Sequence, residues 1–324
     1  MKHLLLLILL SLFFTVSAKN RFTHDVKTEK KPWTHENFQN QNDEFSFIII
    51  PDRTGGERKK GIWASALEKA NMFHPDFIIS VGDMVEGINK PQNLKKEVSE
   101  AQYAELRKIT AASRAPFFHV VGNHDISRTR PGFPMVNEMN AEVWKDNFGV
   151  SYYSFIYKNV LFLCLDQQEG RDSRPTPCGL TPEQTRWALE TLKKHQDVRW
   201  TIIFIHSPWS WNDAPFRKIE KQIKNRNYTV FSGDFHFYNK FRRYGKNYYL
   251  LATAGGVSGL RGVKYGEFDH ITYVTVTADG PKVVNILLDG ILPDDVVTSE
   301  NTLQPKAKQI DKEFERYNKP QEKK

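Results

Sequence analysis

Cysteines are scarce in this sequence, and no hydrophobic run of membrane-spanning length follows the first 18 residues. Only two cysteines occur in 324 residues: Cys164 lies in an apolar run, and Cys178 lies in a loop rich in proline and glycine. We therefore do not expect a disulfide framework, although the sequence leaves open whether the two thiols meet. Internal repeats and long low-complexity segments are also missing, and a hydrophobic content of 40% is typical of a folded protein.

Basic residues are in excess, but they do not form a block. The formal charge of +8 and the pI near 9.2 favour anionic partners, without choosing between a phosphate ester, a nucleic acid and an acidic surface. The sequence contains no recognisable nucleic-acid-binding module and no interleaving of basic and aromatic residues. We therefore expect no specific nucleic-acid partner, and the oligomeric state stays open.

The first 18 residues have the features of a secretory signal. Lys2 and His3 precede an apolar core from Leu4 to Val16, and Val16-Ser17-Ala18 is a small-residue cleavage site. A membrane anchor is the alternative interpretation, but the apolar core is too short to favour a span. We expect cleavage after Ala18, export to the periplasm or the exterior, and no stable membrane span.

The rest of the chain divides into three parts. Residues 19–44 form a polar N-terminal segment, which we interpret as a linker or a loosely attached arm because it lacks an apolar period. Residues 45–290 carry the predicted strands and helices of one domain. Residues 291–324 form a polar C-terminal tail with a weak helical stripe that includes Ile310 and Phe314. This tail either packs back on the domain or stays mobile.

The first half of the domain has an α/β pattern. Strands are predicted over 45–50, 77–81 and 117–121, and helices over about 60–73 and 91–110 lie between them. Strand, helix and strand in succession indicate parallel crossovers.

The second half is richer in strands. Lys158-Asn159 suits a two-residue hairpin between the strands 152–157 and 160–165, and Thr181 caps a helix that runs to about residue 195. Together with the later β-rich pieces, this pattern suggests two facing mixed sheets flanked by helices.

Five predicted strands end in side chains that can bind metal or carry protons. Any one of them is more often a turn residue, a helix cap or a core histidine. Their recurrence at five strand ends instead favours a site at the carboxyl edge of the sheets. These residues are Asp52, Asp83, Asn123 with His124 and Asp125, His206, and Asp234 with His236.

This order of motifs between residues 45 and 290 resembles the calcineurin-like metallophosphoesterases. The resemblance implies an α/β fold, a four-layer αββα sandwich of two mixed β-sheets flanked by helices. It also implies two divalent metal ions and the hydrolysis of phosphate mono- or diesters in small phosphorylated substrates.

The resemblance assigns a ligand set to each ion, with Asp83 as the bridge. One ion takes Asp52, Asp83 and His236, and the other takes Asp83, Asn123, His206 and Asp234. His124 is expected to protonate the leaving group or stabilise the phosphoryl oxygens, with Asp125 holding its ring.

Two arginines are candidates for binding substrate. Arg53 and Arg128 lie next to motif residues and could pair with phosphate oxygens. Loop arginines are more often solvated, so both assignments stay open.

The sequence departs from the family pattern at two positions. Thr54 stands where the family usually has a histidine, and Asp234 stands where the last motif usually has one. Three carboxylates instead of two then face the two ions, so we predict a preference for Mn²⁺, Mg²⁺ or Fe over Zn²⁺, with one ion weakly held. A catalytically weak phosphate- or ligand-binding protein on the same fold is the alternative function.

Overall fold

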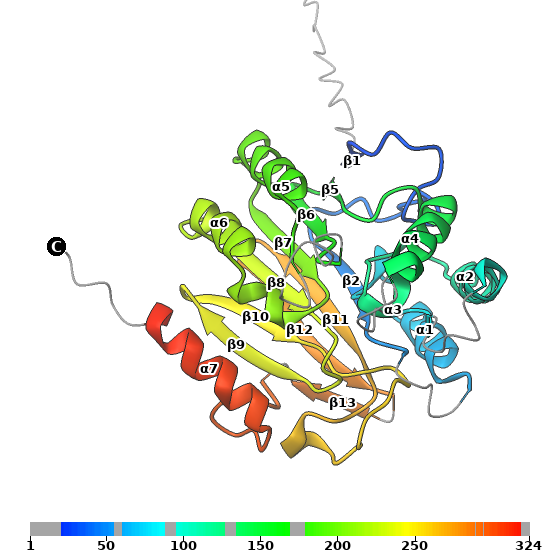
Figure 1. The fold of residues 1–324 in the computed structure, drawn as a ribbon. Coiled ribbons are helices and arrows are strands. Elements are labelled where there is room, and N and C mark those ends of the chain that lie inside the picture. Colours follow the sequence, from blue (N-terminus) through cyan, green and yellow to red (C-terminus); the bar gives the residue numbers. More distant parts are fainter. Residues whose placement is uncertain are drawn as a thin grey trace, which may run out of the picture.

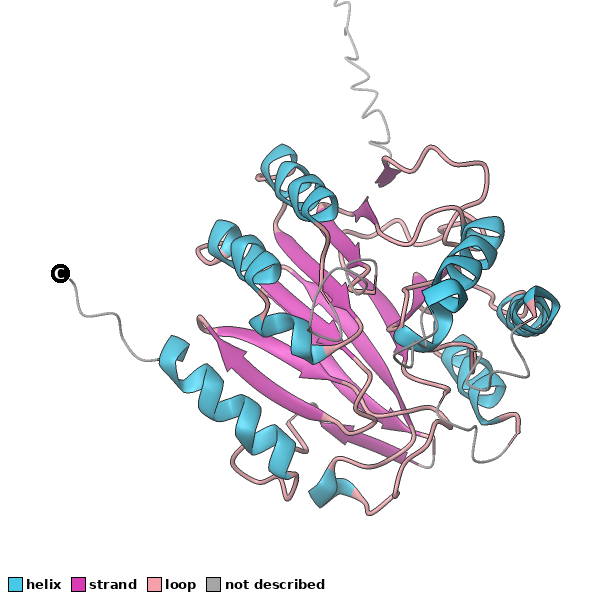
Figure 2. Ribbon diagram, in the orientation of Figure 1, coloured by secondary structure: helices cyan, strands magenta, loops and turns pink. Residues whose placement is uncertain are grey.

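The computed structural model describes residues 21–54, 60–87, 95–126, 134–168, 179–288, 290–293 and 295–318. Two β-sheets are flanked by helices, shown by element in Figure 1 and by secondary structure in Figure 2. The expected signal segment, Arg128 and Cys178 lie outside the described residues.

One sheet has seven strands and the other has six. The seven-stranded sheet has the order β1 (Phe22–His24), β5 (Tyr153–Tyr157), β6 (Val160–Leu165), β7 (Trp200–Ile205), β8 (Tyr228–Ser232), β10 (Lys246–Leu250) and β9 (Asn239–Arg243). The six-stranded sheet has the order β13 (Gly290–Pro293), β12 (Gly280–Leu287), β11 (His270–Thr277), β2 (Phe45–Ile50), β3 (Phe77–Ser80) and β4 (Phe117–Phe118). Both sheets contain parallel and antiparallel pairs, as predicted.

The helices cover the outer faces of the two sheets. They are α1 (Ile62–Met72), α2 (Lys96–Thr110), the short α3 (Asn123–Ile126), α4 (Pro134–Phe148), α5 (Pro182–Lys194), α6 (Ala214–Ile223) and α7 (Pro305–Asn318). Short 3₁₀ turns at Pro208–Asn212 and Val263–Tyr265 lie in loops.

Three hydrophobic clusters bind these layers together. The first joins Phe47 and Phe77 of the six-stranded sheet to Phe162 of the seven-stranded sheet, so it lies between the sheets. The second packs α5, α6 and α7 on the seven-stranded sheet, and the third packs α1, α2 and α4 on the other sheet. Three clusters between four layers confirm the predicted αββα sandwich.

The predicted hairpin and helix cap are both present. Lys158 and Asn159 have φ values of 46° and 60°, the left-handed pair that a tight hairpin between β5 and β6 requires. The Thr181 side chain accepts a hydrogen bond from the backbone N–H of Gln184 at the start of α5.

The interpretation of the N-terminal segment as a loosely attached arm is wrong for the described part of it. Strand β1 pairs antiparallel with β5, and Phe22 is only 7% exposed. Trp33 is also buried and forms a bridge with Phe118 at the end of β4. Isolated aromatic residues fasten this segment, and they produce no apolar period that the sequence could reveal.

The C-terminal segment also packs on the domain. Ile310 and Phe314 of α7 are buried against the seven-stranded sheet, and the Arg243 guanidinium lies 3.9 Å from the Tyr317 ring centroid. Strand β13 continues the six-stranded sheet beyond residue 290, where the polar tail was expected to begin. Of the two options left open for the tail, the structure shows docking.

Parallel strands place the predicted site at the carboxyl edge of the two sheets. Strands β2, β3 and β4 are parallel neighbours, and so are β6, β7 and β8, so their carboxyl ends share one edge in each sheet.

No helix among the described residues is long and apolar enough to cross a membrane.

Candidate metal centre

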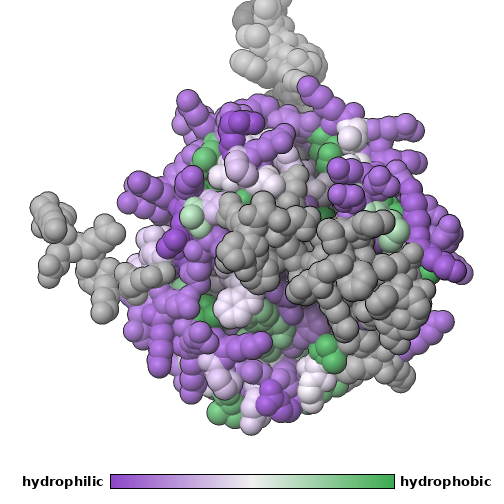
Figure 3. All heavy atoms as spheres, in the orientation of Figure 1, coloured by the Kyte–Doolittle hydropathy of each residue, from purple (hydrophilic) through white to green (hydrophobic). Residues whose placement is uncertain are grey.

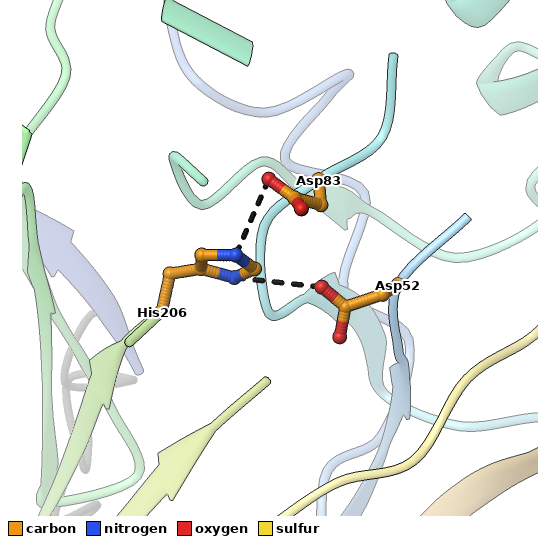
Figure 4. Close-up of side chains that lie close together, drawn as sticks. All are labelled: Asp52, Asp83 and His206. Atoms are coloured by element: carbon orange, nitrogen blue, oxygen red, sulfur yellow. Dashed lines mark ion pairs between the residues drawn. The ribbon is translucent and has the colours of Figure 1, made fainter. Parts of the chain in front are cut away.

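Three side chains from three strand ends meet in the interior. Asp52 follows β2, Asp83 lies just after β3, and His206 follows β7. Each offers a ligand atom within 4.8 Å of the others, and all three are at most 1% exposed. Figure 4 shows the His206 ring between the two carboxylates, with Nδ1 3.6 Å from Asp52 Oδ1 and Nε2 3.2 Å from Asp83 Oδ1.

Two more predicted ligands converge on the same ring nitrogen. His206 Nε2 lies 3.1 Å from Asn123 Oδ1 and 4.0 Å from Asp234 Oδ1. The other nitrogen, Nδ1, lies 2.9 Å from the carbonyl oxygen of Val81, which can only accept a hydrogen bond. The proton of a neutral ring is therefore on Nδ1, and the Nε2 lone pair faces three oxygens.

The buried charges at this point require a positive partner. Burial acts to lower the pKa of His206, but the carboxylates of Asp83 and Asp52 hold that pKa well above its usual value. Burial raises the pKa of Asp52, and the charges of Asp83 and Asp234 add to that rise. Burial also acts to raise the pKa of Asp83, but the imidazoles of His206 and His124 outweigh it and lower that pKa. The cluster of carboxylates thus favours a positive charge at this point.

One carboxylate oxygen in this cluster has no hydrogen-bond partner. Asp52 Oδ2 is buried and unpaired among the described atoms, which is costly for an acceptor of this charge. Carboxylate oxygens, an amide oxygen and imidazole nitrogens are the donor set of Mn²⁺, Mg²⁺, Fe or Zn²⁺ sites. The side chains therefore fit a divalent metal centre.

Three of the predicted ligands adopt a left-handed backbone. The φ values are 56° for Asp83, 75° for Asp234 and 54° for His236, a region that non-glycine residues seldom occupy. Such conformations persist when the surrounding fold imposes them, and they cluster at functional sites.

His236 lies at the edge of the cluster. Its Nδ1 is 2.6 Å from the carbonyl oxygen of Val257, so the proton of a neutral ring lies on Nδ1 and Nε2 is free to act as a ligand. Burial lowers the pKa of His236, which favours this neutral form, although the charges of Asp83 and Asp234 oppose the shift. His236 is not among the three residues whose ligand atoms lie within 4.8 Å of one another.

Glycines give the ligands their close approach to the backbone. A Cβ on Gly122 would lie 2.2 Å from Asp83 Oδ1 and 2.3 Å from the Asp83 backbone nitrogen. A Cβ on Gly233 would lie 2.3 Å from Asp52 Oδ2. Any side chain at these positions therefore displaces a carboxylate of the cluster.

We expect Gly122→Ala to lower the metal content sharply, because the new methyl group would displace both the carboxylate and the backbone of Asp83. Elemental analysis after chelation and refilling measures the effect. Gly290→Ala is the matched control, since a Cβ at Gly290 meets nothing within 4 Å. Equal metal content in the two variants would show that the position of Asp83 does not control metal binding.

The predicted role of Asp125 is wrong. Its Oδ2 accepts hydrogen bonds from the backbone N–H groups of Asp83 and Gly122, and its Oδ1 accepts those of Met84 and Val85. This carboxylate therefore fastens the two ligand-bearing loops to each other. The His124 ring is held instead by the carbonyl oxygen of Glu86, 2.8 Å from Nδ1.

The position of His124 agrees with its predicted place beside the metal ligands. The side chain is 9% exposed, its Nε2 lies 3.9 Å from Asp83 Oδ2, and its backbone N–H donates to Asp83 Oδ1 over 2.8 Å. Since Nδ1 is directed at Glu86, Nε2 is the ring nitrogen on the side of the cluster.

Arg53 has a protein partner. Its Nη2 lies 2.8 Å from Glu105 Oε1 on α2, and its Nη1 lies 3.5 Å from the carbonyl oxygen of Met84. The guanidinium thus ties the first motif to a helix through this ion pair.

Two hydroxyl groups support the carboxylates, and the sequence analysis predicted this role for neither of them. Thr54 Oγ1 donates to Asp83 Oδ2 over 3.0 Å, and Ser207 Oγ donates to Asp234 Oδ2 over 2.6 Å. Thr54 replaces a usual ligand, and here it is a donor to the predicted bridging carboxylate. Hydroxyls next to motif residues are a weak sequence signal, because most such hydroxyls face water.

Comparisons with known proteins agree with this site. The model of the calcineurin-like phosphoesterase family matches residues 34–238. No curated protein sequence matches the chain. A structure of PhoD is 13% identical, with 76% of this chain and 71% of that chain covered and a TM-score of 0.56.

A second similar structure is GAP50, described as the anchor in the inner membrane complex of Plasmodium. It is 13% identical, with 76% of this chain and 85% of that chain covered and a TM-score of 0.51. At such low identity, both structures show a shared fold alone. The family model covers more than half of the chain, and the buried Asp, Asp and His cluster lies at its strand ends. The chain therefore belongs to the calcineurin-like phosphoesterase family and is a metal-dependent phosphoesterase.

Proposed function

We propose that this chain hydrolyses mono- or diesters of phosphoric acid in small substrates, with two divalent cations and with His124 as the acid. The observation that supports this most is the convergence of Asn123, Asp83 and Asp234 oxygens on His206 Nε2, next to an unpaired Asp52 oxygen. When bound, two cations activate a water molecule and stabilise the charge of the transferring phosphoryl group.

We propose the two ligand sets that the family resemblance implies. His206 Nε2, Asn123 Oδ1, Asp83 Oδ1 and Asp234 Oδ1 would hold one cation. Asp52, Asp83 and His236 would hold the other, with Thr54 fixing the shared carboxylate of Asp83.

His124 is suited to proton transfer by its orientation. The Glu86 carbonyl accepts a hydrogen bond from Nδ1, so the protonated ring has its second N–H, at Nε2, on the side of the metal ligands. Donation of that proton to the leaving oxygen would leave a neutral ring still anchored at Nδ1. The ring therefore keeps its position in both protonation states.

Asp234 should determine the metal preference. A carboxylate in place of a neutral imidazole makes the ligand set harder and more negative, which favours Mn²⁺, Mg²⁺ or Fe over Zn²⁺. We expect Asp234→His to move the preference toward Zn²⁺, since histidine tolerates the left-handed backbone at this position.

Elemental analysis after chelation and refilling from an equimolar mixture of Mn²⁺ and Zn²⁺ measures this shift. Ser207→Ala is the control, because it removes the hydrogen bond to Asp234 without changing the type of ligand. Two tightly bound zinc ions in the wild-type protein would contradict the metal assignment.

A catalytically weak binding protein is the second candidate. Thr54 favours this candidate, because its hydroxyl donates a hydrogen bond to Asp83. The cation held by Asp52, Asp83 and His236 would then have only three protein ligands. Assays of an aryl phosphate and a bis-aryl phosphate in Mn²⁺ separate the two candidates. Turnover that chelation abolishes supports the enzyme, whereas phosphate binding without turnover in several metals supports the binding protein.

Export is a separate proposal. The apolar core at Leu4 to Val16 and the small residues before Lys19 support a cleaved signal. N-terminal sequencing of the protein from its native host should find Lys19 as the first residue. A membrane-bound protein that retains residues 1–18 would contradict this proposal.

A further inference from the structure

Three of the large apolar side chains exposed in the described part of the chain belong to segments that carry or contact predicted metal ligands. Trp209 lies three residues after His206, and Val257 carries the carbonyl that holds His236. Leu260 lies in the same loop as Val257, and the backbone N–H of Leu303 donates to the carbonyl of Lys264 in that loop. The full set is Met72, Phe73, Trp209, Val257, Leu260 and Leu303. Met72 and Phe73 lie at the end of α1, and Leu303 lies just before α7.

Trp209 and Phe235 form an aromatic pair in segments that carry predicted metal ligands, and Phe235 also packs against the hydrophobic cluster under α5, α6 and α7. Phe235 stands between Asp234 and His236 in the sequence, and its ring centroid lies 5.0 Å from that of Trp209 in an edge-to-face arrangement. Trp209 keeps 38% of its surface exposed. Trp211, two residues further on, is fully buried, and its Nε1 donates to Ser232 Oγ. Packing beneath the loop therefore accounts for the burial of Trp211. It does not account for the exposed surface of Trp209.

The backbone fixes Val257 in the same region. Its N–H donates to the carbonyl of Thr54 over 3.1 Å, and its carbonyl lies 2.6 Å from His236 Nδ1. Its side chain is nevertheless 52% exposed. Val257 thus forms backbone hydrogen bonds with two motif segments and presents its apolar side chain to solvent.

The neighbouring loop and helix hold this apolar region in place. Glu267 pairs with Arg261 across the loop and accepts a hydrogen bond from Gln304 just before α7. Lys306 in the first turn of α7 lies 5.0 Å from the Phe235 ring centroid as a cation–π contact. In the view of Figure 3, hydrophobic residues, in green, occur in small groups within a mainly hydrophilic purple surface.

We propose that Trp209, Phe235 and Val257 form a specificity surface that binds the apolar leaving group of the phosphate ester. The preferred substrates are then esters of bulky apolar alcohols. Exposed apolar patches rimmed by polar residues commonly mark ligand-binding grooves. This inference rests on the proposed phosphoesterase function, because it places the alcohol part of the ester beside the metal ligands.

Phenethyl phosphate and ethyl phosphate test the surface. Both are monoesters of primary alcohols, so they differ mainly in apolar size. We expect wild-type kcat/KM to be about tenfold higher for phenethyl phosphate, which corresponds to removing roughly 55 Å² of apolar surface from water. Trp209→Ala should reduce the ratio of the two kcat/KM values to about two, since one wall of the surface is lost.

Met72→Ala is the matched control, because it removes an exposed apolar side chain at the far end of α1. The methyl diesters of both alcohols repeat the comparison for a diesterase. Equal kcat/KM values for the two wild-type substrates, or an unchanged ratio in Trp209→Ala, would overturn the specificity surface alone. Hydrolysis of none of the four esters in Mn²⁺ or Mg²⁺ would instead overturn the phosphoesterase proposal.

Discussion

His124→Ala is expected to lower kcat by about 10²- to 10⁴-fold, the usual contribution of a positioned acid. The bound metal should stay unchanged, because the ring lies beside the ligand cluster without belonging to it: Nδ1 contacts the Glu86 carbonyl and Nε2 lies 3.9 Å from Asp83 Oδ2. Steady-state kinetics and elemental analysis on the same preparation separate these two effects.

The leaving group provides a second measurement for His124. Esters with acidic alcohols need little protonation, so the loss in His124→Ala should be smaller for an aryl phosphate than for an alkyl phosphate. His35→Ala, in the N-terminal segment, is the control for removal of an imidazole elsewhere. Equal losses for both esters, or a loss of metal in His124→Ala, would contradict the role of this residue as the acid.

Asp83→Asn should have the largest effect on both metal content and rate. Asp83 Oδ1 accepts a hydrogen bond from the backbone N–H of His124 and lies 3.2 Å from His206 Nε2. Asp83 Oδ2 accepts a hydrogen bond from the Thr54 hydroxyl. An amide has a single oxygen, so its NH₂ group must face one of these donors, and the shared negative charge is lost. We expect kcat/KM to fall by about 10³-fold or more, and both metal sites to weaken.

Metal content and thermal unfolding distinguish this effect from misfolding. Wild-type protein should gain thermal stability when Mn²⁺ is added, because the cations bind the folded state, and Asp83→Asn should gain little. Asp146→Asn is the control, since Asp146 forms an exposed ion pair with Lys96 on the protein surface. Wild-type metal content and activity in Asp83→Asn would be incompatible with a bridging role for this carboxylate.

Periodicity and strand ends carried most of the information about the fold. The apolar runs that become β2 and β6 have the predicted bounds, because a buried strand with a parallel neighbour is a short, continuous apolar segment. Parallel order then brings their carboxyl ends together, so residues far apart in sequence could be assigned to one site.

Helices α4 and α6 were missing from the prediction, although one signal was available for α6. Parallel strands require a crossover connection, and β7 and β8 are parallel neighbours separated by residues 206–227. Helix α4 buries Val143, Trp144 and Phe148 late in its length, and its first half gives little apolar period. The docking of β1 rests on single aromatic contacts, such as Phe22 with Phe155, that no sequence period announces.

In the site, side chains could be predicted but their supports could not. The groups that hold His206, His124 and His236 are the backbone carbonyls of Val81, Glu86 and Val257. Backbone carbonyls occur at every residue, so sequence gives no sign of which one will face a ring. Asp125 was misassigned for the same reason, because its partners are four backbone N–H groups rather than a side chain.

Anomalous diffraction from crystals refilled with Mn²⁺ tests the metal centre most directly. The proposed ligand sets predict two peaks next to Asp83, one beside His206 Nε2 and the other beside Asp52 and His236. A cluster that stays without any peak at saturating Mn²⁺, with the His206 ring still between the two carboxylates, would contradict the metal-dependent site.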